Sequence, residues 1–411
     1  MEIRRLDAPW LNEEPLRAVF SALGAPETDV RAVGGCVRDG ILGRAVRDID
    51  LATPDVPDTV IERLEKAGLK AVPTGLEHGT VTAVFDGRGF EITTLRKDTA
   101  CDGRHADVEF TKDWREDAAR RDFTFNAMSM RPTGEVFDFF GGWEDAERGA
   151  VVFVGDPADR IQEDYLRILR FFRFYAHYGR CAADPGTLEA CHTYRAQLKK
   201  LSAERVRNEL VKMLTADEPA ETVRMMSDTG VLAVVLPEAK NLDVFDNLIA
   251  AEGAASFQNC APDWRRRWVA LVPGGSGDVA KRLHMSNADR AAMRALEEAA
   301  LHVPVDQSIL AMNTFLYRYA PSAVDAALIA SARAGRPDGA LWPDLVKAAR
   351  DWAQPDFPVS GAELTQLGIP EGPQIGDILR NLEDRWIASG FTDSKAVLLD
   401  YARAEAAKKG G

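Results

Sequence analysis

The sequence predicts an α+β protein, in which a small mixed sheet with helices precedes a long, all-helical region. Short apolar or alternating runs, separated by Gly and Pro turns, recur up to Val154 and are typical of strands. Beyond that point, apolar residues recur at the three- and four-residue spacing of helices. We therefore expect three domains: a head at 1–154, a helical neck at 155–215, and a helical body and tail at 216–411.

The stretch from Val33 to Thr53 organises the head. Residues 30–33 have the pattern of a strand, Gly34 and Gly35 come next, and residues 36–42 have the pattern of a short helix. At such a junction, backbone N–H groups can approach a phosphate closely, and a helix N-terminus faces the anion. A Gly-Gly pair taken alone is usually a turn, so a phosphate site here needs support from neighbouring residues.

Two aspartates lie at the start of the next predicted strand, residues 48–52. Asp48 and Asp50 flank Ile49, so on a strand they point to the same side. Two carboxylates on one face repel each other unless a cation lies between them. Mg²⁺ suits the pair, because it binds one or two carboxylates and bridges to substrate phosphates. A phosphate site beside a metal site is what nucleotidyl transfer requires.

The rest of the head is expected to support this stretch. Residues 14–23 and 57–68 have the apolar spacing of helices, and residues 79–85 and 90–95 form a predicted hairpin around an Asp-Gly turn. Glu91, on the second of these strands, is a possible third carboxylate of the metal site. A solvated or salt-bridged strand glutamate is an equally good interpretation from the residues alone.

Four further elements complete the predicted head. Residues 97–112 are polar and Gly-containing, which predicts a mobile loop, and a helix is expected to start at Asp113 or Trp114 and to run to Ala127. A hairpin is predicted at 128–138 and an apolar strand at 151–154.

The string R-R-D-F-T-F-N-A begins at Arg120. Arg120 and Arg121 offer guanidinium groups to triphosphate oxygens, while Asp122 and Asn126 offer a carboxylate and an amide suited to ribose hydroxyls. The alternative is a capped helix end with solvated arginines.

The predicted neck helix, from Ile161 onwards, carries Asp164 and Arg167 three residues apart, hence on one face, with Arg170 a turn further on. A surface ion pair is one interpretation and would contribute less than about 1 kcal/mol. The other is base recognition. Cytosine and adenine each present an amino donor beside a ring-nitrogen acceptor, which a carboxylate and a guanidinium complement. Guanine and uracil would leave these polar groups mismatched, and a hydrogen-bonding site rejects such ligands strongly.

Three motifs occur in one order: G-G-C-V-R-D with D-I-D-L, then R-R-D-F-T-F-N-A, then E-D-Y-L-R-I-L-R. In this order they resemble the class II tRNA nucleotidyltransferases (CCA-adding enzymes) and the similar bacterial poly(A) polymerases. Both groups belong to the polymerase-β-like nucleotidyltransferase superfamily. The resemblance covers residues 30 to 210 at the level of motifs and the remainder only as architecture.

The resemblance implies template-independent addition of CCA to the tRNA 3′ end, with CTP and ATP as substrates and Mg²⁺ as cofactor. It implies that Asp48 and Asp50 are catalytic and hold the metal, which would ionise the 3′-hydroxyl and neutralise charge on the α-phosphate. It also implies that Asp122 contacts the ribose 2′-OH and that the base is read by Asp164 and Arg167. The remaining nucleotide-binding residues are Gly34, Gly35, Arg38, Arg121, Asn126 and Arg170.

The helical region carries fewer functional signals. Residues 201–210 predict a helix capped by Ser202, which we interpret as structural. Arg265 to Arg267, with Trp264 and Trp268, are candidate tRNA contacts, although core tryptophans are the simpler interpretation. Helices are expected at 218–230, 241–251, 262–271, 277–284, 287–300, 306–318, 321–334, 342–352, 361–366, 373–389 and 392–408.

Several functions share these motifs. A poly(A) polymerase, a CC-only enzyme or an A-only enzyme would show the same pattern, as would a non-catalytic RNA-binding protein with the same fold. Intact Asp48 and Asp50 argue against the last of these.

Composition narrows the partners and the compartment. The net charge of −13 argues against a protein that coats nucleic acid, but clustered arginines allow a local groove for one structured RNA. We expect no DNA partner. We also expect no membrane partner, since no apolar run reaches about 18 residues. The acidic, broken N-terminal segment does not resemble a signal peptide. Five scattered cysteines without a C-x-x-C pair favour reduced thiols and a cytoplasmic location.

Overall fold

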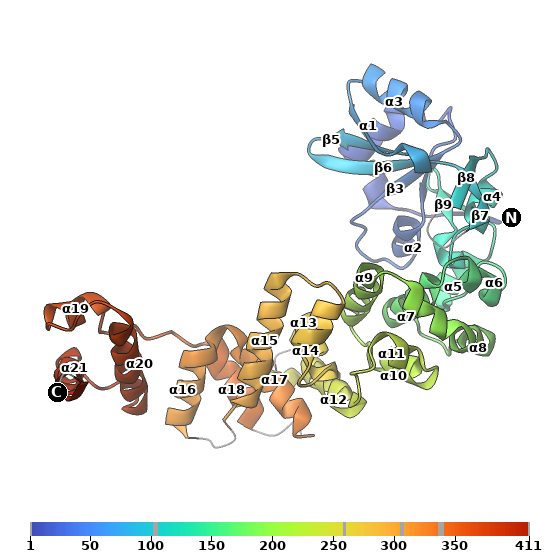
Figure 1. The fold of residues 1–411 in the computed structure, drawn as a ribbon. Helices are drawn as coiled ribbons and strands as arrows, with labels where there is room; N and C mark the ends of the chain where they lie inside the picture. Colours follow the sequence, from blue (N-terminus) through green and yellow to red (C-terminus); the bar gives the residue numbers. More distant parts are fainter. Residues whose placement is uncertain (1, 102–105, 258–259, 305–307, 336–340, 410–411) are drawn as a thin grey trace. The chain divides into compact units, whose positions relative to one another are not determined.

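A computed structural model describes residues 2–101, 106–257, 260–304, 308–335 and 341–409 (Figure 1). The chain forms two compact units, Met1–Pro237 and Glu238–Gly411. Within the described ranges, no helix is both long and apolar enough to cross a membrane.

The head contains a mixed sheet of eight strands in the order β1-β10-β9-β2-β3-β6-β5-β4. Strands β3 and β6 run parallel, while the other paired neighbours are antiparallel. This confirms the predicted class. The strands are β1 Glu2–Arg5, β2 Arg31–Val33, β3 Asp50–Thr53, β4 Lys70–Gly75, β5 Thr80–Phe85, β6 Arg88–Thr94, β9 Ser129–Met130 and β10 Glu135–Asp138.

The predicted mobile loop at 97–112 is wrong for its described part. β7 (Arg96–Cys101) and β8 (Ala106–Phe110) pair as an antiparallel hairpin, with Arg96 opposite Phe110. Backbone pairing between two polar strands gives no hydrophobic periodicity, which is why the sequence pattern missed it. Residues 102–105, which include His105, lie outside the described part of the chain.

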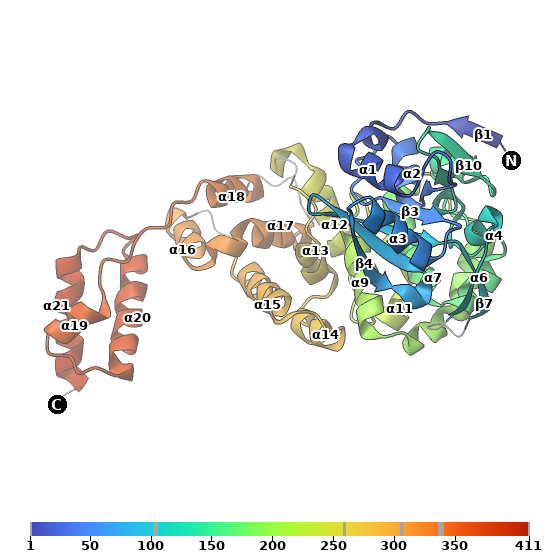
Figure 2. The same ribbon diagram turned by 90° about the horizontal axis from the view of Figure 1, so that it is seen from above.

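Helices pack on the sheet and follow its strands. α1 (Glu14–Ala22) and α3 (Pro57–Lys66) pack on each other and on β5 (Figure 1), and Figure 2 shows both helices from above. α2 (Gly35–Ile41) comes directly after β2, and α5 (Gly142–Arg148) packs against it. The helix predicted from Asp113 to Ala127 is shorter: α4 (Trp114–Ala119) ends before the R-R-D string.

After α4 the backbone of Arg120 is still in the right-handed helical region, and the chain bends at Arg121 and Asp122. Phe123 then pairs with Phe153 in an isolated bridge, and a 3₁₀ turn comes next at Thr124–Asn126. The strand predicted at 151–154 is reduced to this one bridge. Consequently Asp122 lies in a bend between two short helices rather than within one helix.

The neck consists of short helices. A single helix was expected from Ile161 onwards, but the helix is interrupted at Asp164, whose backbone is extended, between the end of α6 and the start of α7. Ser202 caps α9 through a bond from the Arg205 N–H, as predicted. The helices are α6 Pro157–Glu163, α7 Leu166–Tyr178, α8 Pro185–Tyr194, α9 Ala203–Leu214, α10 Ala220–Asp228 and α11 Val231–Val235.

Head and neck share one core. The Phe123 ring centroid lies 4.7 Å from that of Phe153 and 5.2 Å from that of Phe174 on α7. Because these rings are buried on both sides of the contact, they stabilise the packing of the neck against the head. The predicted boundary at 154 therefore divides residues that pack as one unit, and the three-domain division stays a prediction.

The second unit is all helical, as predicted, and its helices begin and end within a few residues of the predicted positions. α17 packs against α12, α15 and α18, while α20 packs against α16, α19 and α21. The helices are α12 Leu242–Gly253, α13 Trp264–Leu271, α14 Ser276–Arg282, α15 Asn287–Leu301, α16 Ile309–Tyr319, α17 Ala323–Arg333, α18 Leu341–Arg350, α19 Gly361–Gln366, α20 Pro373–Ala388 and α21 Lys395–Lys409.

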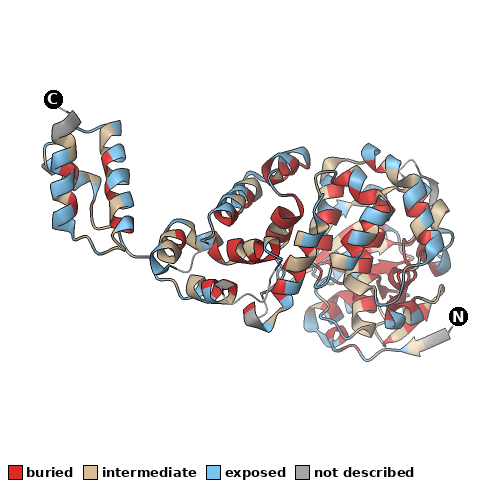
Figure 3. Ribbon diagram, turned by 90° about the horizontal axis from the view of Figure 1, so that it is seen from below, coloured by how far each residue is buried: buried red, intermediate tan, exposed pale blue. Residues whose placement is uncertain are grey.

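The arginines predicted as tRNA contacts in this unit are mostly core residues. Arg266 and Arg267 are 4% and 1% exposed, and both form ion pairs with Glu252, at 2.7 and 2.6 Å. Trp268 is also fully buried. Figure 3 shows such buried positions along the inner faces of the helices. The cationic cluster that the sequence showed is thus a buried charge network, because α13 is surrounded by other helices.

Glu252→Gln is expected to destabilise the second unit by about 3–5 kcal/mol, since it removes the carboxylate that pairs with the buried Arg267 and leaves the buried Arg266 with Asp325 alone. Urea unfolding monitored by tryptophan fluorescence would measure this. Asp351→Asn, which breaks the exposed pair with Lys347, is the control and should change stability by less than about 1 kcal/mol. Equal midpoints for the two variants would contradict the structural role of Glu252.

Candidate active site

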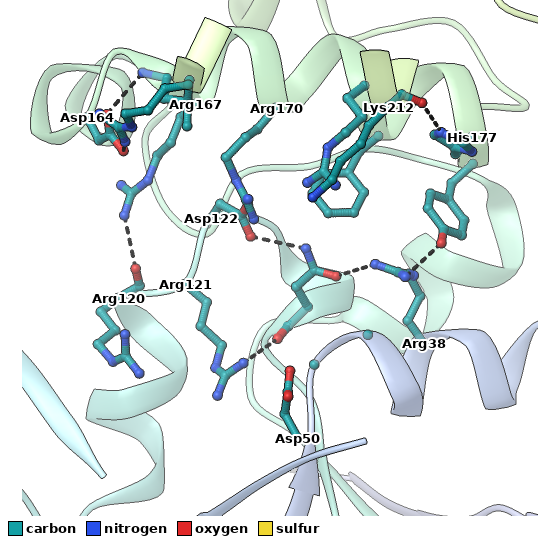
Figure 4. Close-up of a pocket in the computed structure, with 18 of the residues that line it drawn as sticks. Arg38, Asp50, Arg120, Arg121, Asp122, Asp164, Arg167, Arg170, His177 and Lys212 are labelled. Atoms are coloured by element: carbon teal, nitrogen blue, oxygen red, sulfur yellow. Dashed lines mark hydrogen bonds and ion pairs between the residues drawn. The ribbon is translucent and has the colours of Figure 1, made fainter. Parts of the chain in front are cut away.

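A cavity of about 730 Å³ lies between head and neck (Figure 4). Seven arginines and one lysine line it, against three aspartates, so the cavity is locally cationic in a chain of net charge −13. The lining residues are Gly34, Gly35, Arg38, Asp50, Arg120, Arg121, Asp122, Asn126, Asp164, Leu166, Arg167, Arg170, Arg173, Phe174, His177, Tyr178, Arg205, Lys212 and Thr215.

The Gly-Gly junction lies at the edge of this cavity. Gly34 adopts a φ of +74°, and a Cβ atom there would lie 3.1 Å from Nη1 of Arg121. Its N–H donates to the Met128 carbonyl, so the N–H groups that can face a ligand begin at Gly35. Glycine is required here because the backbone is left-handed and the arginine is close.

The carboxylates lie beside the junction. Asp50 opens β3 opposite Val33, and Asp48 precedes the strand, so the predicted strand at 48–52 is displaced to 50–53. Ile49 is buried while Asp48 and Asp50 are exposed, as the alternation predicted. Since Leu51 pairs in parallel with Ile92, Glu91 is the neighbour of Asp50 on β6.

The pKa of Asp50 is raised by partial burial of its carboxylate, then by the charge of Glu91 and, more weakly, of Asp48, while Arg121 opposes these effects. The three carboxylates therefore interact electrostatically and offer the hard oxygen donors that Mg²⁺ prefers. They are not gathered into a preformed triad: no metal-holding group of three such side chains occurs among the described residues. The donor set thus fits a divalent cation held by two carboxylates with substrate oxygens.

Asp122 lies at the centre of the cavity and is nearly fully buried. Its Oδ1 accepts from the Phe123 N–H at 2.9 Å and from Asn126 Nδ2 at 3.1 Å, and its Oδ2 accepts from Arg170 Nε at 2.6 Å. Burial alone would raise the pKa of Asp122, but the Arg170 charge and these hydrogen bonds hold that pKa below its usual value.

Arg120 and Arg121 share one partner, and Arg121 makes a further contact. Both pair with the buried Asp117, at 3.2 and 2.8 Å, and Arg121 Nη1 also donates to the Asn126 carbonyl. Figure 4 shows the Arg121 side chain beside Asp50. Arg121 therefore lies close to the carboxylate of the proposed cation site, and its charge acts on Asp50.

The expected Asp164–Arg167 ion pair is wrong. Asp164 Oδ2 accepts from Arg205 Nη2 at 2.6 Å, and Oδ1 caps α7 through the Leu166 N–H. Arg167 instead pairs with Glu163 and donates to the carbonyls of Arg160 and Arg120. The break in the helix at Asp164 turns the two side chains apart, and both still line the cavity (Figure 4).

Sequence reasoning missed several lining residues. Arg205 was interpreted as structural. Its i, i+3 relation to the capping residue Ser202 marks the start of a helix, and the structure shows that Arg205 lines the cavity. Arg173, His177, Tyr178 and Lys212 carry no motif signal. For Arg173, His177 and Tyr178 the available clue was that the lining positions on α7, at 170, 173, 174, 177 and 178, match one helix face, whereas Lys212 lies on α9.

Comparison with known proteins supports a nucleotidyltransferase. The chain matches the poly A polymerase head domain over residues 30–152 and the probable RNA and SrmB-binding site of polymerase A over residues 183–242. It is 33% identical to the mouse mitochondrial CCA tRNA nucleotidyltransferase 1, covering 98% of this chain and 93% of that protein. It is 31% identical to the CCA-adding enzyme of Limosilactobacillus fermentum, covering 98% of each.

The fold agrees. The Bacillus stearothermophilus CCA-adding enzyme in complex with CTP superimposes with a TM-score of 0.76 at 26% identity, covering 97% of this chain and 100% of that one. Whole-length identity, fold and the motif order together place this chain in the CCA tRNA nucleotidyltransferase family, the CCA-adding enzymes.

Proposed function

We propose that this protein adds C, C and A to the 3′ end of tRNA, using CTP and ATP without a nucleic-acid template. The observation that carries the proposal is the composition of one cavity, which is lined by the exposed Asp50 carboxylate, by the Gly-Gly junction, and by the buried Asp122 and Asn126 with Arg170. Relatives matched over nearly their whole length are named for CCA addition, which favours this activity over poly(A) synthesis or CC-only and A-only addition.

In this reaction the RNA 3′-oxygen forms a bond to the α-phosphorus, the bond to the bridging β-oxygen breaks, and pyrophosphate leaves. Gly35 and Arg121 face the triphosphate, and Gly34 makes room for the arginine. Asp48 and Asp50, with Glu91 beside them, would hold Mg²⁺. A cation held there would favour ionisation of the 3′-hydroxyl and would offset the charge that develops on the α-phosphate.

The ribose and base meet the neck. The 2′-OH would lie against Asp122 and Asn126. The second amide hydrogen of Asn126 could donate to it, and the Asp122 carboxylate could accept from it in place of one of its present donors. Asp164 and Arg167 would each contact the base edge, but not as an ion pair, because Asp164 is held by Arg205 and Arg167 by Glu163. Pre-oriented polar groups of this kind lose hydrogen bonds with a mismatched base, which gives selectivity.

The end of the cavity lined by His177, Lys212 and Thr215 remains for the RNA. Lys212 lies on α9, the helix that also presents Arg205, and Arg173 lines the same cavity from α7. Cations at this end suit the backbone phosphates of the acceptor strand.

We also place the protein in the cytoplasm. Cys36, Cys181, Cys191 and Cys260 are free thiols in the described structure. Free thiols of this kind suit a reducing compartment, where disulfides are rare.

Asp50→Asn is expected to lower the rate of nucleotide addition by at least about 100-fold, because a neutral amide weakens the cation site and its charge stabilisation. A tRNA transcript with labelled CTP and Mg²⁺ would report the rate. Asp58→Asn, an exposed change on α3, is the control. Undiminished addition by Asp50→Asn would refute the catalytic assignment.

Asp164→Ala and Arg167→Ala are expected to relax base choice, raising incorporation of UTP and GTP relative to CTP by at least about 10-fold. The measurement is competition between pairs of nucleotides on one transcript. The exposed neck variant Asp159→Asn should keep the wild-type ratios. Slower addition with unchanged ratios would show that these two residues support the neck and do not read the base.

Lys212→Ala is expected to raise KM for tRNA about three- to tenfold and to leave KM for CTP unchanged, since one phosphate contact is removed. The effect should shrink as salt increases. Lys199→Ala, exposed outside the cavity, serves as the matched control. A higher KM for CTP instead would assign this end of the cavity to the nucleotide.

A further inference from the structure

Arg38 is held by protein groups on several sides. Its Nε and Nη2 donate to the two carboxylate oxygens of Asp39, both at 3.0 Å. Nη1 donates to Asn126 Oδ1 at 2.6 Å, and Nη2 also donates to Tyr178 Oη at 2.7 Å. The Tyr178 ring lies 4.1 Å from the guanidinium carbon. Four of the five N–H groups of a guanidinium are thus already directed at protein acceptors.

This arrangement leaves Arg38 little capacity to bind a triphosphate directly. The residue is 6% exposed, and moving its side chain toward a phosphate would break its bonds to Asp39, Asn126 and Tyr178 together. By contrast, Arg121 is more exposed and lies next to Gly34. The resemblance implies that Arg38 is a nucleotide-binding residue, and a positioning role fits the structure better than direct contact with the triphosphate.

What Arg38 does fix is the amide of Asn126. A guanidinium can only donate, so Asn126 must turn its oxygen to Arg38 and its nitrogen to Asp122, which it reaches at 3.1 Å. The flipped amide would place N–H against N–H on one side and oxygen against carboxylate on the other. Asp122 in turn binds Arg170. A continuous set of bonds runs from α2 through the ribose end of the cavity to α7.

Tyr178 closes this set from the neck. Its hydroxyl accepts from Arg38 and donates to Asp39 Oδ1 at 3.0 Å, so it fixes the orientation of both members of that pair. Its ring covers one face of the guanidinium, and Arg44 lies 4.4 Å from the same ring. The hydroxyl and the ring make separate contributions, which a Phe substitution separates.

We propose that Tyr178 is a positioning residue for sugar selection: through Arg38 it holds the Asn126 amide and the Asp122 carboxylate in the orientation that recognises a ribose 2′-hydroxyl. The proposal rests on the proposed function and deepens it. A hydrogen-bonding set that is held in place rejects a substrate lacking the hydroxyl, whereas a loosened set discriminates less.

The test compares the affinities of CTP and dCTP by calorimetric titration with Mg²⁺ and without RNA. Tyr178→Phe should lower the preference for CTP about three- to tenfold, mainly through weaker CTP binding, since the hydroxyl's bonds to Arg38 and Asp39 are both lost. Tyr175→Phe is the matched control: it lies on the same helix, and its hydroxyl binds the Cys181 carbonyl outside the cavity. It should keep the wild-type preference.

Arg38→Lys provides a second test that retains the charge. A positioning role predicts reduced preference for CTP over dCTP, whereas a triphosphate ligand predicts equal weakening of both nucleotides. Unchanged preference in Tyr178→Phe, or equal weakening of CTP and dCTP in either variant, would overturn the proposal.

The binding test also separates this proposal from the reaction itself. A wild-type protein that prefers CTP to dCTP but extends no tRNA would refute the proposed function and leave the role of Tyr178 supported by the variants. A wild-type protein with equal affinity for CTP and dCTP would overturn the role of Tyr178 directly.

Discussion

Three arginines of the neck bind the segment Ala119–Asp122, and the geometry of the site depends on these bonds. Arg160 and Arg167 donate to the carbonyls of Ala119 and Arg120, each at 3.1 Å, and Arg170 pairs with the Asp122 carboxylate. Because Ala119 and Arg120 end α4, their carbonyls have no partner further along the helix and can accept these donors. The bonds hold the parts that would bind phosphate and base within one compact unit. Arg170 is half-buried, and although burial alone would lower its pKa, the Asp122 charge raises that pKa and stabilises the charged form, which makes the contact hard to remove singly.

Much of this could be predicted because the chemistry is local. Asp48 and Asp50 are separated by one buried residue, so alternation alone places them on one side. Gly34 adopts a backbone that favours glycine, and the capped helix at Ser202 begins where its sequence indicates. Glu91 is adjacent to Asp50 in the sheet, as a carboxylate on the neighbouring strand would be. The helices of the second unit also match their apolar spacing, which is the strongest local signal.

The remainder depends on long-range contacts that no local pattern encodes. Asp164 was expected to pair with Arg167, three residues away, but a helix break separates them, and Arg205 from another helix takes the carboxylate. Arg266 and Arg267 look like a surface patch in sequence, yet Glu252 on a different helix holds both in the core. Polar hairpins such as β7–β8 pair through backbone and show no periodicity. In each case the deciding partner lies on another element of the fold.

The ordered addition of three nucleotides is tested most directly by the length of the product on tRNA. The substrate is a transcript that ends at the discriminator base, supplied with Mg²⁺ and with labelled CTP, ATP, UTP or GTP, singly and in mixtures, and resolved at single-nucleotide length. We expect two C additions with CTP alone, one A more when ATP is present, and then a stop. Long runs of A on any RNA, addition that halts after two Cs with ATP present, or no addition in any mixture would contradict CCA addition by this protein.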